Sequence, residues 1–418
     1  MFKFKTLTVF LFVFLPTIVL ASGFQIPHQS VTAVGLAGAH IAYTPGPDAA
    51  YYNPANMSFL SDSWKIEAGI TSLYLPSIDY SDNRSPLFDG SSDSELFYLP
   101  LLHLSSNDYH GFRFGLSLTS PFGLAKSWDQ PFPAATSKKF SLNAVELNPT
   151  ASYLVFDNLS IGGGLRLLYA KGEVVNEITN PPFNQLSPLS SLSRTMEGDD
   201  IQAGYNLAAT LRPASGWAIA TTYRSEIELE LDGDASLQAL VGNAAIMHYN
   251  GFGTLELTLP AEFSLATSYG IKDFTFEVTW NRTFWSSFDE LDFQYDQSFL
   301  TTPLDGFDRA VKKDWQDTNA IRFGVTYELT NSLTTNLGFA IDESPVPDST
   351  IGFDLPDSDS YTYGAGLQYQ QNKNLLIALS YMYQHITSRT VPAQASGLDG
   401  EFTGAGAHAF TVGLIYEF

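Results

Sequence analysis

The chain has 418 residues and a formal charge of −23 at pH 7, with 44 acidic residues against 21 basic ones. A surface this acidic excludes nucleic acid as a partner, and the absence of cysteine excludes disulfide frameworks and thiolate metal sites. Aromatic residues make up 14% of the chain, yet no apolar run after Leu20 approaches the roughly 20 residues that a membrane helix needs. A helical membrane protein is therefore excluded.

The first 21 residues have the pattern of an export signal. Lys3 and Lys5 precede an apolar run from Leu7 to Leu20, which is followed by small residues. This order is typical of a cleavable signal peptide, and the run is too short for a membrane anchor. We expect residues 1–21 to be removed, so that the mature chain starts near Ser22.

Residues 22–62 are rich in Gly, Ala and Pro and show no sustained alternation. A stretch of about forty residues is long for an unstructured tail on a compact protein. We expect it to fill the lumen of a closed barrel as a hatch, or plug. Within it, Asn53-Pro54-Ala55 favours a turn, because proline fixes its own φ and restricts the residue before it. We interpret Asn53, Pro54 and Ala55 as an anchor of the hatch.

Residues 63–418 alternate between apolar and polar side chains, which predicts about fourteen strands. The expected strands are 64–75, 95–104, 110–119, 143–156, 159–172, 201–212, 217–231, 254–270, 273–285, 318–329, 332–342, 361–370, 374–388 and 407–418. Long polar links alternate with very short ones, which is typical of an up-and-down membrane barrel with long outer loops and tight periplasmic turns. The predicted fold is an all-β, 14-stranded antiparallel transmembrane β-barrel in the outer membrane of a Gram-negative bacterium. A soluble β-sandwich is the alternative.

The alternation also predicts which side chains face lipid. In 217–231, one face carries Trp217, Ile219, Tyr223, Ile227, Leu229 and Leu231, and the other carries Arg224, Glu226, Glu228 and Glu230. Because charges are costly in lipid, the second set is expected to line the lumen. Strands 273–285 and 318–329 divide in the same way. In the last strand, the apolar face ends at Phe418, which we expect to be the recognition end for the barrel-assembly machinery, by analogy with other outer-membrane barrels.

Several motifs resemble one known family. Gly23-Phe24-Gln25, the small-residue run 33–39 and Asn53-Pro54-Ala55 are similar to the hatch of the FadL-type long-chain fatty acid transporters, which include aromatic-hydrocarbon relatives. Further matching stretches are Thr119-Ser120-Pro121-Phe122-Gly123-Leu124, Leu257-Thr258-Leu259-Pro260 and Leu355-Pro356-Asp357. The resemblance covers nearly the whole mature chain. It implies passive uptake of hydrophobic molecules: capture in the outer loops, transfer to a pocket beside the hatch N-terminus, and exit through a gap at a kink in the third strand.

A fatty acid head group requires a cation, so basic residues near strand ends are informative. By resemblance, Lys171, Lys312 and Lys313 contact the head group, together with the α-amino group at Ser22, while Gly23 and Phe24 border the pocket. The alternative is that these lysines are solvated charges paired with acidic neighbours. We expect the partners to be a fatty acid or similar ligand, outer-membrane lipid and lipopolysaccharide, and the protein to be a monomer.

Apolar residues in the outer loops form a second candidate site. Phe122, Trp128, Phe132, Phe183 and Leu186 are either a capture groove or anchors that pack the loops. Gly115, in the third strand, either permits the kink or relieves crowding inside the barrel, because glycine in a strand often marks a bulge.

Two other classes of function compete with fatty acid uptake. An enzyme is disfavoured because the sequence has no Gly-x-Ser-x-Gly motif and its seven histidines are dispersed. We therefore expect no catalytic residues, cofactor or metal. A general porin is disfavoured because the hatch would block its lumen, whereas uptake of aromatic hydrocarbons remains open.

Overall fold

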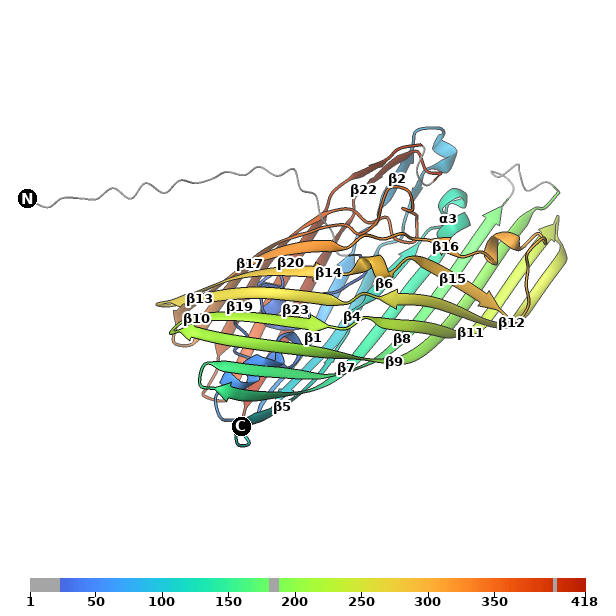
Figure 1. Cartoon of the computed structure of the whole chain (residues 1–418). Coiled ribbons are helices and arrows are strands. Elements are labelled where there is room, and N and C mark those ends of the chain that lie inside the picture. Colours follow the sequence, from blue (N-terminus) through green and yellow to red (C-terminus); the bar gives the residue numbers. More distant parts are fainter. Residues whose placement is uncertain (1–22, 180–187, 394–396) are drawn as a thin grey trace, which may run out of the picture.

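The computed structural model describes residues 23–179, 188–393 and 397–418. The expected signal peptide, Ser22, Phe183 and Leu186 lie outside the described residues. Within those ranges, fourteen antiparallel strands close into a barrel, because the first and last strands pair with each other (Figure 1). The strands are β1 (Lys65–Leu75), β4 (Glu95–Ser105), β5 (Phe112–Thr119) continued by β6 (Gly123–Ser127), β7 (Lys139–Phe156), β8 (Leu159–Thr179), β9 (Ser191–Ala214), β10 (Trp217–Arg224) continued by β11 (Ile227–Val241), β13 (Glu262–Ile271) preceded by β12 (Ala244–Leu259), β14 (Phe274–Thr283) continued by β15 (Glu290–Tyr295), β17 (Thr318–Thr330), β18 (Leu333–Asp342), β19 (Ser360–Gln370), β20 (Leu375–Ile386) and β23 (Gly406–Glu417). The predicted fold class is confirmed.

Shorter elements occupy the lumen and the end of the barrel away from the C-terminus. The N-terminal segment holds α1 (Val31–Gly35), α2 (Ala49–Tyr52) and η1 (Pro54–Phe59). The loops hold η2 (Pro86–Phe88), α3 (Pro131–Ser137), η4 (Trp285–Ser287), η5 (Asp305–Phe307), β16 (Val311–Lys312), and a four-stranded sheet of β2 (Asp79–Asp82), β3 (Gly90–Ser91), β21 (Arg389–Val391) and β22 (Gly400–Thr403). Among the described residues, no helix has the length and apolar character needed to cross a membrane.

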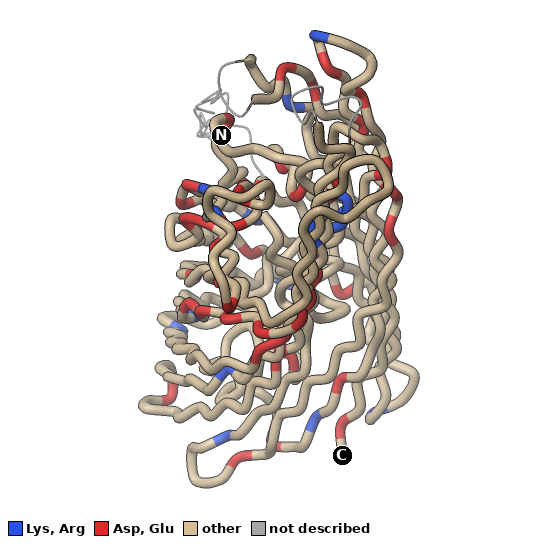
Figure 2. The backbone as a smooth tube through the Cα atoms, turned by 90° about the vertical axis from the view of Figure 1, so that its right-hand side faces the viewer, with Lys and Arg blue, Asp and Glu red and all other residues tan. Residues whose placement is uncertain are grey.

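The outward faces follow the predicted alternation in most strands. In β23, Phe410, Val412 and Leu414 are exposed, whereas Thr411 and Ala409 are buried against the lumen. In β14, Phe276 and Trp280 likewise point outward and Glu277 points inward, as predicted, and β17 follows the same rule. Figure 2 shows the acidic residues mainly in the half of the barrel away from the C-terminus. The apolar band is the surface that lipid covers.

For the expected strand 217–231, the predicted orientation of the side chains was wrong after residue 225, in the half farther from the C-terminal end of the barrel. The strand is interrupted at Ser225 and Glu226, and the side-chain alternation shifts there. Above the break, Ile227, Leu229 and Leu231 are buried in the lumen, while Glu226, Glu228 and Glu230 face outward. Above the lipid band the outside of the barrel meets water, so outward carboxylates cost little there. The apolar residues are thereby free to line the interior.

The predicted lengths of the outer loops were also too large. The link expected between strands 217–231 and 254–270 is a hairpin, because β11 and β12 continue to a turn at Gly242. The expected strand 254–270 is interrupted at Pro260 and Ala261, between β12 and β13. Strand β9 pairs with both β10 and β11, so the wall extends well beyond the lipid band. These extended strands enclose the outer part of the lumen.

Residues 23–60, here called the N-terminal segment, lie inside the barrel at the end that holds the C-terminus (Figure 1). Helix α1 contacts β19 and β20, and η1 contacts β7 and β8 on the other side. Nearly all residues from His28 to Met57 are buried. The segment therefore fills the lumen where the expected hatch was placed.

Candidate functional site

The barrel wall has a window beside the third strand. Strands β4 and β5 pair only as far as Leu102 and Leu118, and the next wall strand, β6, pairs with β7 but not with β4. The gap closes again where the amide of Asp93 donates to the carbonyl oxygen of Ser127 (2.9 Å). Residues 95–101 of β4 therefore form one edge of the window, and residues 119–126 form the other.

The interruption does not lie at Gly115, so the prediction that this glycine permits the kink was wrong, and the alternative that it relieves crowding inside the barrel agrees with the structure. Gly115 pairs with both Ser105 and Thr150 in the regular part of β5. A Cβ atom there would lie 2.6 Å from the Met57 sulfur and from the Ala50 Cβ, so Gly115 permits close approach of the N-terminal segment. The strand is interrupted at residues 120–122, where Pro121 has no amide hydrogen for a ladder bond.

The start of the N-terminal segment pairs with this interruption. The amide of Ile26 donates to Pro121 O (2.8 Å), and the amide of Gly123 donates to Phe24 O (3.0 Å). The Gln29 side chain forms two further bonds of 2.8 Å with the backbone of Ser120. Residues 23–28, here called the front, thus act as a short added strand at the edge of the window.

An inner cavity of about 350 Å³ lies between the front and the window. Its lining is largely apolar and comes from the front, β1, β4, β6, β7, β20, β23 and the loop before β19. The lining includes Gly23, Phe24, Ile26, Leu73, Phe97, Leu99, Phe122, Leu124, Val145, Leu355 and Met382, with Lys126, Asn143, Asp357 and Gln384 as polar members. An apolar cavity with few polar groups is suited to a hydrophobic ligand.

A larger outer cavity of about 720 Å³ lies among the loops. A small apolar pocket, here called the passage, lies between the two: it shares Phe140, Leu291 and Asp354 with the outer cavity, and Phe24, Leu124 and Leu355 with the inner one. The Phe24 ring closes this passage. Its centroid lies 4.8 Å from that of Trp285 and 5.7 Å from those of Phe288 and Trp315.

A third hollow, of about 320 Å³, lies at the window. It shares Phe97, Ala125, Lys126 and Asn143 with the inner cavity, so the two meet through the wall. The three hollows and the passage therefore follow one another from the loops to the side of the barrel.

The structure places the predicted lysines differently from one another. Lys171 is exposed and paired with Glu197, away from the inner cavity but at the hollow outside the window. Lys312 and Lys313 both line the outer cavity. Lys312 is exposed, whereas Lys313 is buried and paired with Asp354. None of the three reaches the inner cavity.

The predicted aromatic residues also separate. Phe122 lines the inner cavity, and Phe132 lines the outer one. Trp128 is fully buried, lines none of the hollows described above, and donates its indole N–H to Phe353 O (2.9 Å). Trp128 therefore packs the loops instead of forming a capture surface. Phe418 lies at the end of the wall, with its amide bonded to Trp64 O.

Sequence reasoning missed Lys126. This lysine is only 6% exposed and lines both the inner cavity and the hollow at the window. It lies two residues after Leu124, on the lumen-facing side of β6. A signal was present, since a lysine on the apolar face of a short strand is unusual. It was overlooked because the residues between the expected strands 110–119 and 143–156 were interpreted as one of the long polar links.

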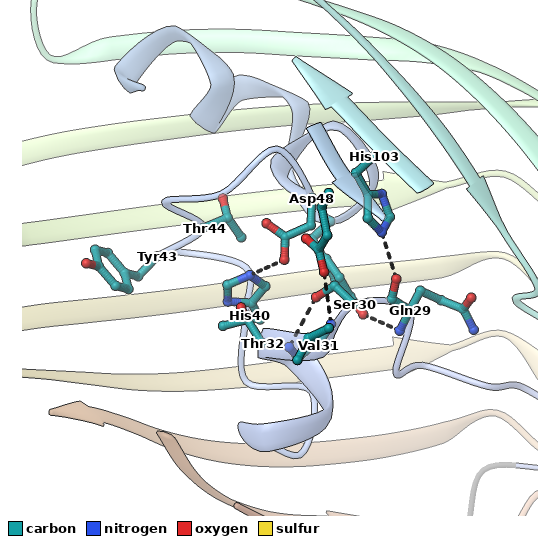
Figure 3. Close-up of polar contacts among 12 residues, drawn as sticks. Gln29, Ser30, Val31, Thr32, His40, Tyr43, Thr44, Asp48 and His103 are labelled. Atoms are coloured by element: carbon teal, nitrogen blue, oxygen red, sulfur yellow. Dashed lines mark hydrogen bonds and ion pairs between the residues drawn. The ribbon is translucent and has the colours of Figure 1, made fainter. Parts of the chain in front are cut away.

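Polar contacts hold the rest of the N-terminal segment, residues 29–60, here called the body (Figure 3). His40 Nε2 and Asp48 Oδ2 are 2.9 Å apart, and Asp48 raises the pKa of His40 against the opposing effect of burial. His103 of β4 contacts Gln29 O (2.8 Å), and Glu67 of β1 accepts the amide of Val31. Within the described ranges, no group of three or more His, Asp or Glu residues forms a metal site.

Other buried wall residues add to this attachment. Glu277 of β14 accepts the amides of Ile41, Ala42 and Tyr43 at 2.5 to 2.9 Å. The Asn53 side chain donates to Ile41 O and to the hydroxyl oxygen of Thr210 in β9, and accepts the Ala55 amide. Pro54 begins η1. The body is thus attached to both sides of the barrel.

A family model described as outer membrane protein transport protein (OMPP1/FadL/TodX) matches residues 12–418. The chain belongs to this family. Among its relatives, the long-chain fatty acid transport protein of Escherichia coli O6:H1 is 24% identical over 400 residues, covering 87% of each chain. Outer membrane protein P1 of Haemophilus influenzae is 22% identical over 405 residues, covering 87% of this chain and 86% of its own.

Solved structures of OMPP1/FadL/TodX proteins have the same fold. A Pseudomonas aeruginosa FadL homologue has a TM-score of 0.82 at 20% identity, covering 95% of this chain and 100% of its own. The Pseudomonas putida toluene transporter TodX has a TM-score of 0.74 at 15% identity, covering 93% of this chain and 98% of its own. The chain is therefore an outer-membrane transport protein, and its apolar cavities suit hydrophobic cargo.

Proposed function

We propose that this protein takes up long-chain fatty acids through the outer membrane, along the path from the outer cavity to the window. The observation that carries the proposal is the shared lining of successive cavities, which lead from the loops past Phe24 to an opening in the wall. The likeness to long-chain fatty acid transport proteins supports this choice of cargo.

The physical chemistry favours several graded sites over one deep pocket. Each methylene removed from water contributes about 0.8 kcal/mol, so one dry pocket that enclosed a tail of about fifteen methylenes would gain on the order of 12 kcal/mol and release its cargo slowly. Dividing the path at Phe24 limits how much of a tail is enclosed at once. Movement of the front then opens the passage by shifting a pre-existing equilibrium.

Lateral exit is the second part of the proposal. A tail leaving through the window enters the apolar core of the bilayer without crossing water, which avoids the cost of rehydrating it. Phe97 of β4 lines both the inner cavity and the hollow at the window, and the exposed side chains of Tyr98 and Val145 continue the apolar lining onto the outer surface.

Uptake by a transporter-deficient Gram-negative bacterium tests both parts. Cells carrying this chain should accumulate labelled oleate, and Ala125→Trp, which fills the window from its outer side, should abolish most of that uptake. Ala203→Trp, on the exposed face of β9, is the matched control and should leave uptake unchanged. Full uptake by the Ala125→Trp variant, with the barrel folded, would contradict lateral exit.

Aromatic hydrocarbons are the second candidate cargo. The ring of Trp285, Phe288 and Trp315 around Phe24 offers edge and face contacts to an aromatic ligand, and TodX is described as a toluene transporter. If the complemented strain takes up toluene but not oleate, this alternative replaces the first. A general porin would instead show large steady ion conductance in planar bilayers.

A further inference from the structure

Lys126 has an environment unlike that of the other lysines at the window. Its side chain is buried, and among the described residues its ammonium group forms no hydrogen bond or ion pair. Lys139 and Lys171, which line the same hollow, are paired with Glu173 and Glu197. Buried charges are usually paired, so an unpaired one in a cavity wall indicates a missing partner.

The charges around Lys126 leave room for such a partner. Glu95 of β4 is the acidic residue that acts on Lys126 electrostatically, from the opposite edge of the window, but the two are not within ion-pair distance. The other charged residues of the hollow, Lys139, Lys171 and Glu173, are already in ion pairs. The rest of its lining is apolar or neutral, including Phe97, Ala125 and Asn143. Among the described residues of the hollow, Lys126 is therefore the lysine whose charge is left for a small anion that enters between the two edges.

The position of Lys126 along the wall is also informative. Its lumen-facing neighbour Leu124 lines the inner cavity. The exposed apolar residues of β7 and β8 end at Val145 and Tyr169, and the next outward position on β8 is Lys171. The hollow that contains Lys126 and Lys171 thus lies where apolar outer surface gives way to charged surface, which is the level of the lipid head groups.

We infer that Lys126 binds the carboxylate head of the cargo at the window and makes the protein selective for hydrophobic acids over neutral hydrophobic compounds of the same shape. This inference rests on the proposed function and names the chemical class of its substrate. While the tail moves through the window into the bilayer, Lys126 holds the head at the depth that a fatty acid carboxylate occupies in a leaflet. Release then needs only a lateral step.

Charge-assisted bonds of this kind have a measurable size. One ammonium–carboxylate contact in a buried site changes affinity by roughly tenfold to a hundredfold. A neutral alcohol of equal length forms a weaker hydrogen bond with the same ammonium group. The cost of removing that ammonium group from water is then offset less by the alcohol than by the acid. The preference for the acid over the alcohol is thus the quantity that isolates the role of Lys126.

The test compares the binding of oleate and oleyl alcohol to purified protein, by displacement of a fluorescent fatty acid. Lys126→Met should weaken oleate binding by about tenfold to a hundredfold and change alcohol binding by less than about twofold, whereas Lys126→Arg should keep the preference for the acid. Lys138→Met is the matched control: this lysine lines none of the hollows described above and is paired with Glu177, so its loss should change neither ligand.

The outcomes separate the inference from the function on which it rests. If Lys126→Met weakens both ligands equally, the lysine is structural and the inference fails. If the wild-type protein binds both ligands equally, the inference also fails, while transport of hydrophobic compounds stands. If the wild-type protein binds neither ligand and cells carrying it take up neither, it is the proposed function that fails.

Discussion

The front and the body of the N-terminal segment are attached to the barrel in different ways. The body is held by buried charged side chains on several strands, including Glu67, Glu277 and Arg322. The front is held by a few backbone bonds to the interrupted strand, by aromatic contacts of Phe24, and by two part-buried bonds to the carboxylates of Asp357 and Glu262. An element that must keep the lumen closed needs the first kind of attachment, and an element that must open a passage needs the second.

This difference indicates where a transport movement takes place. Releasing the body would leave several buried charges without partners, each at a cost of about 1–3 kcal/mol or more. Releasing the front exposes the Phe24 ring and a short run of backbone, which water can satisfy. The two carboxylates that it leaves, Asp357 and Glu262, still accept from Ser344 and from Ser264 and Asn281. The movement that passes cargo is therefore expected in residues 23–28, while residues 29–60 stay in place.

Disulfide locks give the largest expected contrast between the two regions. The chain has no cysteine, so introduced pairs are unambiguous. Gln25 and Phe122 face each other in an antiparallel bridge, a geometry that accepts a disulfide. Gln25→Cys with Phe122→Cys should abolish oleate uptake when oxidised and regain it on reduction, because the locked front cannot clear the passage.

The matched lock is in the body. The hydroxyl groups of Ser58 and Ser160 are 2.8 Å apart, so Ser58→Cys with Ser160→Cys should also form a disulfide. Uptake by this variant should be the same oxidised and reduced. Loss of uptake on oxidising the body lock alone would reverse the assignment of the moving region.

Glu277 is the next largest expected effect, since one carboxylate accepts three amides of the body. In Glu277→Leu these amides lose their acceptor, and we expect a loss of stability on the order of 3 kcal/mol together with raised ion conductance. Thermal unfolding and planar bilayer recordings measure the two effects. Glu228→Leu, on the outward face of β11, should change neither. Unchanged conductance in Glu277→Leu would show that the body does not depend on this anchor.

The same division explains how much the sequence could reveal. The lipid-facing alternation of β14, β17 and β23 was predictable, because lipid imposes it on each strand separately. The outer half of the barrel was not, because lipid no longer covers its outer face. Leu229 and Glu230 exchanged their expected sides for that reason.

The site was predicted only in part. Gly23 and Phe24 came from the family resemblance, and both border the inner cavity. The window could not be located from a glycine, since it arises from a strand interruption and from the pairing of the front with Pro121 and Gly123. Contacts between residues about a hundred positions apart leave no local pattern in one sequence.

A smaller effect is expected from replacing Phe24, and it concerns how long the protein retains a bound ligand. In Phe24→Ala the passage between outer and inner cavities opens, and we expect the release of a fluorescent fatty acid to accelerate by about tenfold. Removing a buried aromatic side chain lowers the free energy of unfolding by about 3–5 kcal/mol. Only the part of this energy that keeps the passage closed affects the release of the ligand. Phe299→Ala removes a buried ring that does not line the passage, and controls for lost packing. Equal release rates in both variants would mean that Phe24 is not the barrier.

The smallest expected effect is a pH dependence of the front. Asp357, in the loop before β19, accepts the Gly23 amide (3.2 Å) and the Ser344 hydroxyl (3.0 Å), and burial raises its pKa to about 7. A raised pKa means that the closed state binds the proton more tightly than the open, hydrated state. The contribution of Asp357 to the stability of the closed state, relative to the open state, is therefore largest below about pH 4. It declines as the pH rises towards 7 and is constant above that.

Hydrogen exchange of the front amides, corrected for the intrinsic pH dependence of exchange, reports this change. Protection of residues 23–26 should fall between pH 5 and pH 7, by at most about tenfold per pH unit. The Asp357→Asn variant carries no titrating group at this position, so its protection should be flat over the same range, and amides of the body should not respond in either protein. If body amides lost protection together with the front, the two regions would move as one, and the contrast between them would no longer explain how the passage opens.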